Sequence, residues 1–254
     1  MKISVVTINL NNSDGLRRSL SSFFSQKDHT SEIIVIDGMS NDTSALVIRE
    51  YKTRVSKFVI EKDTGIFNAM NKGIKLAAGD YIYFLNSGEV FFSDNTLSIV
   101  ENALYDDSKI YYFNVDFYFG EKLLGHANND LSWFVHQSCL VPAKLMRRYL
   151  FDDKYKIFGD LDLWTRLKRD GAFNLQYVEE TICIMKLDGI GSSPFYPKRK
   201  IFEKYLYARK HKKYMKSTVS AINILISYLI VLFFGEEFLF FKYYPFVNKV
   251  KNAF

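Results

Sequence analysis

Polar side chains that could hold a phosphate or a metal ion follow four apolar runs in the first part of the sequence. Asn9 ends the first run, Asp37 the second, and Asp63 follows the third. The fourth run, residues 81–85, leads directly into the polar turn Asn86-Ser87-Gly88-Glu89. One polar residue at such a place is usually a turn or cap residue. Four groups of them at the edge of one sheet predict a binding site.

The apolar runs alternate with segments of helical periodicity. We expect strands at residues 3–8, 32–36, 57–60 and 81–85, and helices at 13–24, 43–51 and 66–76. Short apolar strands separated by helices indicate an α/β fold with a mainly parallel sheet, covered on both faces. Such sheets bind ligands at the carboxyl ends of their strands, where the polar residues above would lie.

Composition and motifs exclude several other classes. The chain has 254 residues and is 48% hydrophobic, which is enough for a sizeable core. Cys139 and Cys183 have no spacing typical of metal ligands, so we expect two reduced thiols. The motifs of dinucleotide-binding, P-loop, zinc-protease and serine-hydrolase sites do not occur. The apolar run near Met1 is too short for a signal peptide, which predicts a cytoplasmic protein.

The positive charge concentrates near the end of the chain. Nine Lys or Arg residues and one Glu lie between Lys198 and Lys216, and the 14 mostly apolar residues 221–234 follow. A membrane span needs about 20 apolar residues, so this pattern favours a helix at the membrane interface beside anionic lipid. A core helix that packs on the domain is the alternative, and binding to nucleic acid is not expected.

Five blocks in a fixed order connect these residues to a known family. They are ISVVTINLNN, EIIVIDGMSND, DTGIFNAMNKGIKLAAGDYIYFLNSGE, HQSCLVPAKLM and FGDLDLWTRLKRDG. Over residues 1–195 the sequence resembles the family 2 glycosyltransferases of the GT-A fold, in particular bacterial enzymes of O-antigen, capsule and exopolysaccharide synthesis. The resemblance implies a nucleotide-binding half at 1–92, an acceptor half at 93–195 and a membrane-associated helical appendage at 196–254.

The resemblance also implies roles on the donor side. Thr7 and Asn9 match the segment that lines the base pocket, and Asp37 matches the carboxylate that recognises the base. Asn86, Ser87, Gly88 and Glu89 occupy the DxD position, where Glu89 would hold Mn²⁺ or Mg²⁺ on the donor diphosphate. The motif here has a single carboxylate, and it is Glu where Asp is usual. Asp63 and Lys72 flank the helix that faces the donor, so each either contacts the nucleotide sugar or faces solvent.

Asp160 matches the catalytic base of the family, which takes the proton of the acceptor hydroxyl. Asp162 points to another side of the same helix, where we expect it to pair with Arg166 at i+4. His136 and Gln137 resemble a block near the acceptor cleft, although His136 could equally be a core residue. The glycine segment 189–192 resembles a lid.

The function implied is inverting transfer of a hexosyl group from a nucleotide-diphosphate sugar, expected to be a UDP-sugar. The acceptor would be a lipid-diphosphate-linked saccharide at the inner face of the cell membrane. Two alternatives remain open. One is a non-catalytic saccharide-binding or scaffold protein, favoured by the missing first acid of the DxD motif. The other is a sugar nucleotidyltransferase, disfavoured because no basic residue precedes Arg17 in the loop after the first strand.

Overall fold

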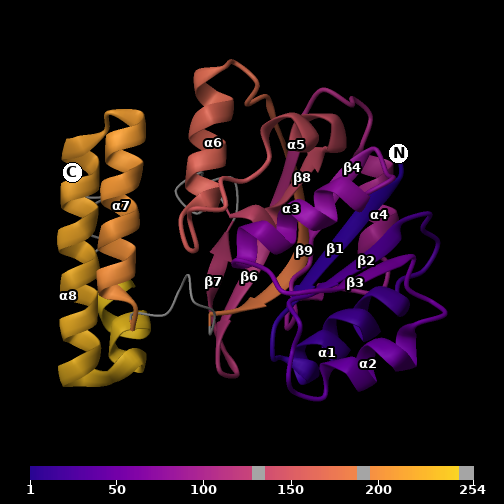
Figure 1. Cartoon of the computed structure of the whole chain (residues 1–254), viewed down its shortest axis with the longest axis horizontal. Coiled ribbons are helices and arrows are strands. Elements are labelled where there is room, and N and C mark those ends of the chain that lie inside the picture. The colour runs from indigo at the N-terminus through magenta and orange to yellow at the C-terminus, as the bar shows by residue number, and fades with distance from the viewer. Residues whose placement is uncertain (128–134, 188–194, 246–254) are drawn as a thin grey trace. The chain divides into compact units, whose positions relative to one another are not determined.

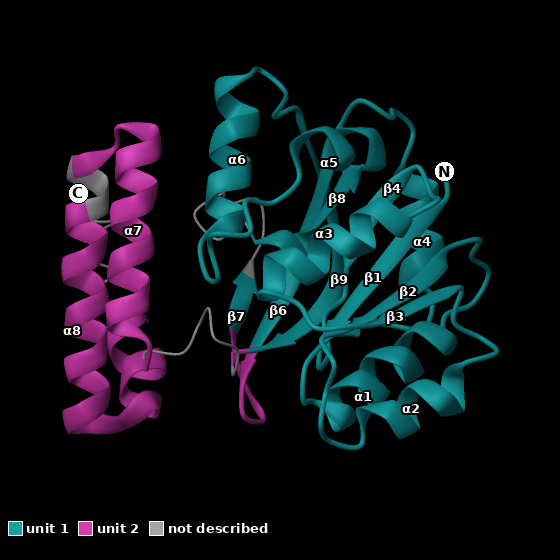
Figure 2. Cartoon of the chain, viewed as in Figure 1, with its two compact units in different colours: residues 1–117, 125–186 teal, residues 118–124, 187–254 magenta. Residues whose placement is uncertain are grey.

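The computed structural model describes residues 1–127, 135–187 and 195–245, with the backbone alone at 127 and 215–217. Its chain forms two compact units (Figure 2). The first comprises residues 1–117 and 125–186, and the second comprises 118–124 and 187–254. The sequence-based boundary at residue 195 lies inside the second unit. The predicted glycine lid at 189–192 lies outside the described residues.

Four parallel strands form the half of the sheet that the polar strand ends share. They are β1 (Ile3–Asn9), β2 (Glu32–Asp37), β3 (Lys57–Ile60) and β4 (Tyr81–Phe84). β1 lies between β2 and β4, and β3 flanks β2 (Figure 1). β-branched residues fill β1 and β2, which are buried along their whole length. The predicted parallel sheet is confirmed.

Helices pack on both faces of these strands. They are α1 (Ser13–Phe24), α2 (Ser44–Tyr51) and α3 (Ile66–Leu76). α3 packs on the face that carries Val6, because its Gly73 lies directly against the Val6 side chain. Asn9 has the other orientation and bonds to Ser44 of α2. The expectation that helices cover both faces is therefore confirmed.

The strand pairings given for the rest of the sheet are antiparallel. β8 (Cys139–Pro142) pairs antiparallel with β4, and the strand order is β3-β2-β1-β4-β8-β6-β9-β5. The other elements of this part are β5 (Val90–Phe91), α4 (Thr96–Ala103), β6 (Ile110–Phe119), β7 (Lys122–Ala127), the short helix η2 (His136–Ser138), α5 (Ala143–Tyr149), α6 (Gly159–Arg169) and β9 (Leu175–Lys186). Because β8 borders β4, η2 and α6 come to the carboxyl end of β4.

The second unit contains α7 (Pro197–His211), α8 (Tyr214–Phe238) and the π-helical η3 (Leu239–Tyr243). The 14-residue apolar stretch expected from the sequence is part of a longer helix. Among the described residues, one helical segment, Thr218–Tyr243, could cross a membrane by length and composition alone, with mean hydropathy 2.1 and 11% of its most apolar window buried.

That segment is not one straight helix. Gly235 has φ 82° and ψ 169°, which interrupts the helical backbone. Beyond it the chain turns back, because the Tyr244 hydroxyl donates a hydrogen bond of 3.4 Å to the Ser227 hydroxyl. Not every basic residue between Lys198 and Lys216 is exposed. Lys200 is buried, and burial lowers its pKa to about 8.

Candidate active site

Asp37 is the centre of a buried polar cluster at the ends of β1 and β2. Its Oδ2 accepts a 2.7 Å hydrogen bond from Asn9 Nδ2 and a 2.8 Å bond from Ser40 Oγ, while Oδ1 accepts from the Ser40 amide. Thr7 is fully buried below Asn9. The structure thus brings Thr7, Asn9 and Asp37 together at one strand edge, with their side chains turned into the protein.

Gly38, which is buried, lies beside this cluster. A Cβ atom there would be 2.5 Å from Asp63 Oδ2 and 3.2 Å from Leu10 Cδ1, so the two side chains close over the glycine backbone. Leu10 is 57% exposed. Leu10 is not among the residues predicted from the sequence, where its signal is an apolar residue between the polar Asn9 and Asn11 at a strand end.

Lys72 contacts the loop that leads to Asp63. Its ammonium lies 2.9 Å from Glu61 Oε1 and donates to the Lys62 carbonyl, which ties it to the loop that precedes Asp63. Asp63 in turn accepts a 2.9 Å bond from the Gly65 amide at the start of α3. Lys72 therefore holds the loop, while Asp63 faces Gly38.

The turn after β4 is fixed by side chains from several elements. Ser87 Oγ donates to Asn9 Oδ1 at 2.8 Å, and the Gly88 amide donates to Ser19 Oγ of α1 at 2.9 Å. Glu89 bonds back to the start of the same turn, because its Oε2 accepts a 2.7 Å hydrogen bond from the backbone amide of Asn86. The strand end and the Asp37 cluster thus form one continuous network.

The Glu89 carboxylate points inward. It is 8% exposed, and its Oε1 accepts a 2.7 Å bond from Gln137 Nε2 of η2. Burial raises the pKa of Glu89, against the opposing effects of His136, Gln137 and Asn86. The side chain therefore joins the turn after β4 to η2.

This donor set fits a resident divalent metal poorly. A cation at the turn would meet one carboxylate, whose two oxygens already accept hydrogen bonds, where Mg²⁺ or Ca²⁺ sites normally offer several free oxygens. No group of three or more His, Cys, Asp or Glu side chains suited to a metal occurs among the described residues. The metal role of Glu89 stays a prediction, and the observed geometry gives it a structural role.

Asp160 lies in the first turn of α6, where its side chain is 28% exposed. Its Oδ1 accepts a 2.7 Å bond from the Leu161 amide, which leaves Oδ2 as the outer oxygen. α6 sits close to α3 because Gly159 packs against the Phe67 ring, where a Cβ would lie 2.5 Å from a ring carbon. The small residue thus lets the start of α6, which carries Asp160, approach α3 closely.

His136 lies between the turn after β4 and Asp160. Its Nε2 is 3.1 Å from Asn86 Nδ2, and its Nδ1 is 3.9 Å from Asp160 Oδ2. The ring packs edge-on against Phe84 of β4, with centroids 6.3 Å apart. The structure therefore brings His136, Gln137, Asn86, Glu89 and Asp160 into one cluster.

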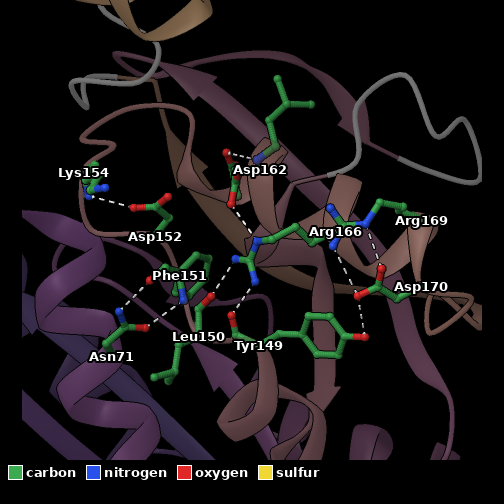
Figure 3. A network of polar contacts seen from close by, with 12 residues as sticks. Asn71, Tyr149, Leu150, Phe151, Asp152, Lys154, Asp162, Arg166, Arg169 and Asp170 are labelled. Atoms are coloured by element: carbon green, nitrogen blue, oxygen red, sulfur yellow. Dashed lines mark hydrogen bonds and ion pairs between the residues drawn. The ribbon is translucent and has the colours of Figure 1, made fainter. Parts of the chain in front are cut away.

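A second network anchors α6 (Figure 3). Arg166 Nε donates to the buried Asp162 carboxylate at 2.7 Å, and its other nitrogens donate to the carbonyls of Tyr149 and Leu150 at the end of α5. The predicted i+4 pair is confirmed. Asn71 of α3 also exchanges two bonds of 2.9 Å with the Phe151 backbone. These contacts fix the helix that carries Asp160 relative to α3.

With the cluster described, comparison with known proteins decides the family. Residues 4–170 match the model of glycosyl transferase family 2. The chain belongs to this family.

Curated relatives of this family member match it over part of their length. An uncharacterised glycosyltransferase of Mycobacterium tuberculosis is 35% identical over 103 residues, covering 40% of this chain and 39% of the relative. The poly(ribitol-phosphate) β-N-acetylglucosaminyltransferase TarP of Staphylococcus aureus is 34% identical over 94 residues, covering 35% of this chain and 29% of TarP. The aligned segment spans about two fifths of the first relative.

Solved structures share the fold of this family member. S. aureus TarS in complex with UDP-GlcNAc matches with a TM-score of 0.61 at 14% identity, covering 94% of this chain and 75% of TarS. The mannosyltransferase PcManGT of Pyrobaculum calidifontis, in complex with GDP-Man and Mn²⁺, matches with a TM-score of 0.61 at 16% identity, covering 83% and 64%. The expected GT-A fold is confirmed.

Proposed function

We propose that this family 2 protein is an inverting glycosyltransferase that uses a nucleotide-diphosphate sugar, with Asp160 as its base. The observation that carries the proposal is the place of Asp160. It is a partly exposed carboxylate, fixed on a helix, within reach of the turn that ends β4. A base must lie beside the reacting hydroxyl and near the donor, and a partly exposed carboxylate next to His136 supports this role for Asp160.

The reaction is a single displacement. The acceptor hydroxyl oxygen attacks the anomeric carbon, a new C–O bond forms, and the bond from that carbon to the diphosphate oxygen breaks. The proton of the hydroxyl passes to Asp160 Oδ2, and the nucleoside diphosphate leaves with the electron pair. Attack from the face opposite the leaving group inverts the anomeric configuration.

The donor surface is the region around Gly38. Leu10 offers an apolar face for the nucleotide base, and the Asp63 carboxylate supplies an acceptor for imide or hydroxyl hydrogens, while the buried Asp37 orders the strand ends beside it. We propose a UDP-sugar, in keeping with the UDP-GlcNAc bound to TarS. A divalent cation, Mn²⁺ or Mg²⁺, would then arrive on the donor diphosphate as part of the substrate, since the described residues fit a resident metal poorly.

The acceptor is proposed from the second unit. α8 exposes a series of large apolar side chains: Val219, Ile222, Leu225, Leu229, Leu232, Phe233 and Phe234. α7 carries basic residues that suit anionic lipid. A helix of this kind favours attachment at the inner face of the cell membrane. A lipid-diphosphate-linked saccharide of O-antigen or capsule synthesis is the acceptor that such a position serves.

The test joins donor binding to transfer. Thermal shift against a panel of nucleotide sugars, with and without EDTA, identifies the donor by the stabilisation it causes. With that donor, Asp160→Asn should bind normally, whereas transfer to a lipid-linked acceptor should fall by about 10² to 10⁴. A variant that transfers at the wild-type rate would remove Asp160 as base. Binding of a sugar without any transfer by the wild type would favour a saccharide-binding module.

A further inference from the structure

His136 connects the donor-side turn to the proposed base through its two ring nitrogens. Nε2 lies 3.1 Å from Asn86 Nδ2, and Nδ1 lies 3.9 Å from Asp160 Oδ2. The ring is largely buried and packs against Phe84. A histidine held only for packing would not need both nitrogens directed at polar partners from two separate elements.

The state of the ring follows from its neighbours. Asn86 Nδ2 can only donate, so Nε2 must accept, and the ring proton of the neutral imidazole is then on Nδ1. The Asn86 amide has this orientation because Nδ2 also faces Glu89 Oε1 at 3.4 Å. The reversed amide would place its oxygen against that carboxylate. Glu89 therefore fixes the orientation of the Asn86 side-chain amide. That orientation fixes the tautomer of His136, whose Nδ1–H group then points at Asp160.

We infer that His136 is a positioning residue that holds the Asp160 carboxylate in its base orientation, with its tautomer set by Asn86 and Glu89. The inference rests on the proposed function. The separation of 3.9 Å is longer than a hydrogen bond, so the inference requires Asp160 Oδ2 to turn toward the ring. Asp160 Oδ1 is already held by the Leu161 amide, so a second donor at Oδ2 fixes the whole carboxylate.

The arrangement links the two substrates. Asn86 and Glu89 belong to the turn that the donor diphosphate approaches, whereas Asp160 acts on the acceptor hydroxyl. A change in the turn that moves the side-chain amide of Asn86 alters which ring nitrogen of His136 carries the proton. It therefore alters whether His136 offers an N–H group to Asp160. The ordered turn is thus the condition for an oriented base.

Two substitutions separate the two nitrogens. His136→Asn keeps a nitrogen near the place of Nδ1, and His136→Gln keeps one near the place of Nε2. We expect His136→Gln to lower kcat by about 10²-fold, the scale of a misplaced catalytic group, with little change in donor Kd. His136→Asn should lose clearly less. His29→Gln, the same change at a histidine that packs on Phe23 in the same unit, should keep wild-type kcat.

The decisive readout is the double variant. In the Asp160→Asn background, His136→Gln should cause no further loss, because its effect passes through Asp160. An additive loss, or wild-type kcat in both single His136 variants, would overturn this inference. If Asp160→Asn itself transferred normally, the proposed function would fall first. Melting temperatures verify folding, and if His136→Gln does not fold, His136→Asn against His29→Asn carries the comparison.

Discussion

At the scale of single residues, Gly38 is the position where the donor surface has the least room. Its missing side chain leaves space that Asp63 and Leu10 already border at 2.5 and 3.2 Å from a notional Cβ. Gly38→Ala should therefore displace both side chains and lower nucleotide affinity by about tenfold or more, the equivalent of roughly 1.4 kcal/mol. The melting temperature should change little, because the Asp63 carboxylate can swing outward. Titration calorimetry with UDP measures the affinity. An unchanged Kd would mean that the uracil base binds away from Gly38.

Residue-level prediction succeeded where the signal was local. Asp162 and Arg166 are one helical turn apart, so their pairing follows from helix geometry alone. The inward turn of Glu89 does not, since it depends on Gln137, which arrives from η2. The same holds for Asn86 and His136. Side-chain direction at a strand end is decided by partners that are distant in the sequence.

At the scale of elements, α6 is held by an ion pair that its own sequence supplies. Removing Arg166 takes an ion-pair partner from the buried Asp162, a loss that costs about 3–5 kcal/mol for a buried pair. Arg166→Met should also release the carbonyls of Tyr149 and Leu150, and so loosen the helix that carries Asp160 (Figure 3). We expect lower stability to urea and a kcat reduced more than donor affinity.

Arg169 gives a matched control for that variant. It lies on the same helix and pairs with Asp170, but it is exposed. Arg169→Met should therefore change the stability little and leave transfer intact. Equal losses of stability and transfer in the two variants would mean that the buried pair stabilises α6 no more than the exposed pair does.

The elements of the first half were predictable nearly to the residue, and the reason is physical. Each strand of β1 to β4 is a short β-branched or aromatic run, and a helix separates each strand from the next, so the pattern is complete within a short window. β8 and β9 carry no such signal, because their pairing partners are distant. The length of α8 was underestimated because its flanking polar residues are helical as well.

At the scale of the whole molecule, the exposed apolar face of α8 predicts that the protein binds to membranes. Phe233 and Phe234 are among its most exposed side chains. Burying a Phe side chain in an apolar phase is worth about 1.5–3 kcal/mol, so replacing both by Ser should lower binding to anionic vesicles at least about tenfold. Flotation with vesicles measures this. Phe58→Ser, at an exposed position of β3, should float like the wild type.

Transfer to a water-soluble acceptor analogue should persist in the double Phe variant, because neither residue belongs to the cluster around Asp160. Undiminished flotation would instead favour packing of α8 on other protein surfaces. Flotation that falls equally on neutral and anionic vesicles would assign retention to the apolar face alone, without a contribution from the basic residues of α7.

The strand order has a consequence for how the protein is made. β1 to β4 follow one another along the chain, so a nascent polypeptide can assemble them early with only short loops to close. The turn at Asn86 to Glu89 is different, because β5, which follows it, pairs with β9 near the end of the first unit. A ribosome must therefore synthesise β9 before that turn is secured on both sides. The candidate site is therefore completed late in synthesis, after both α6 and β9 have been made.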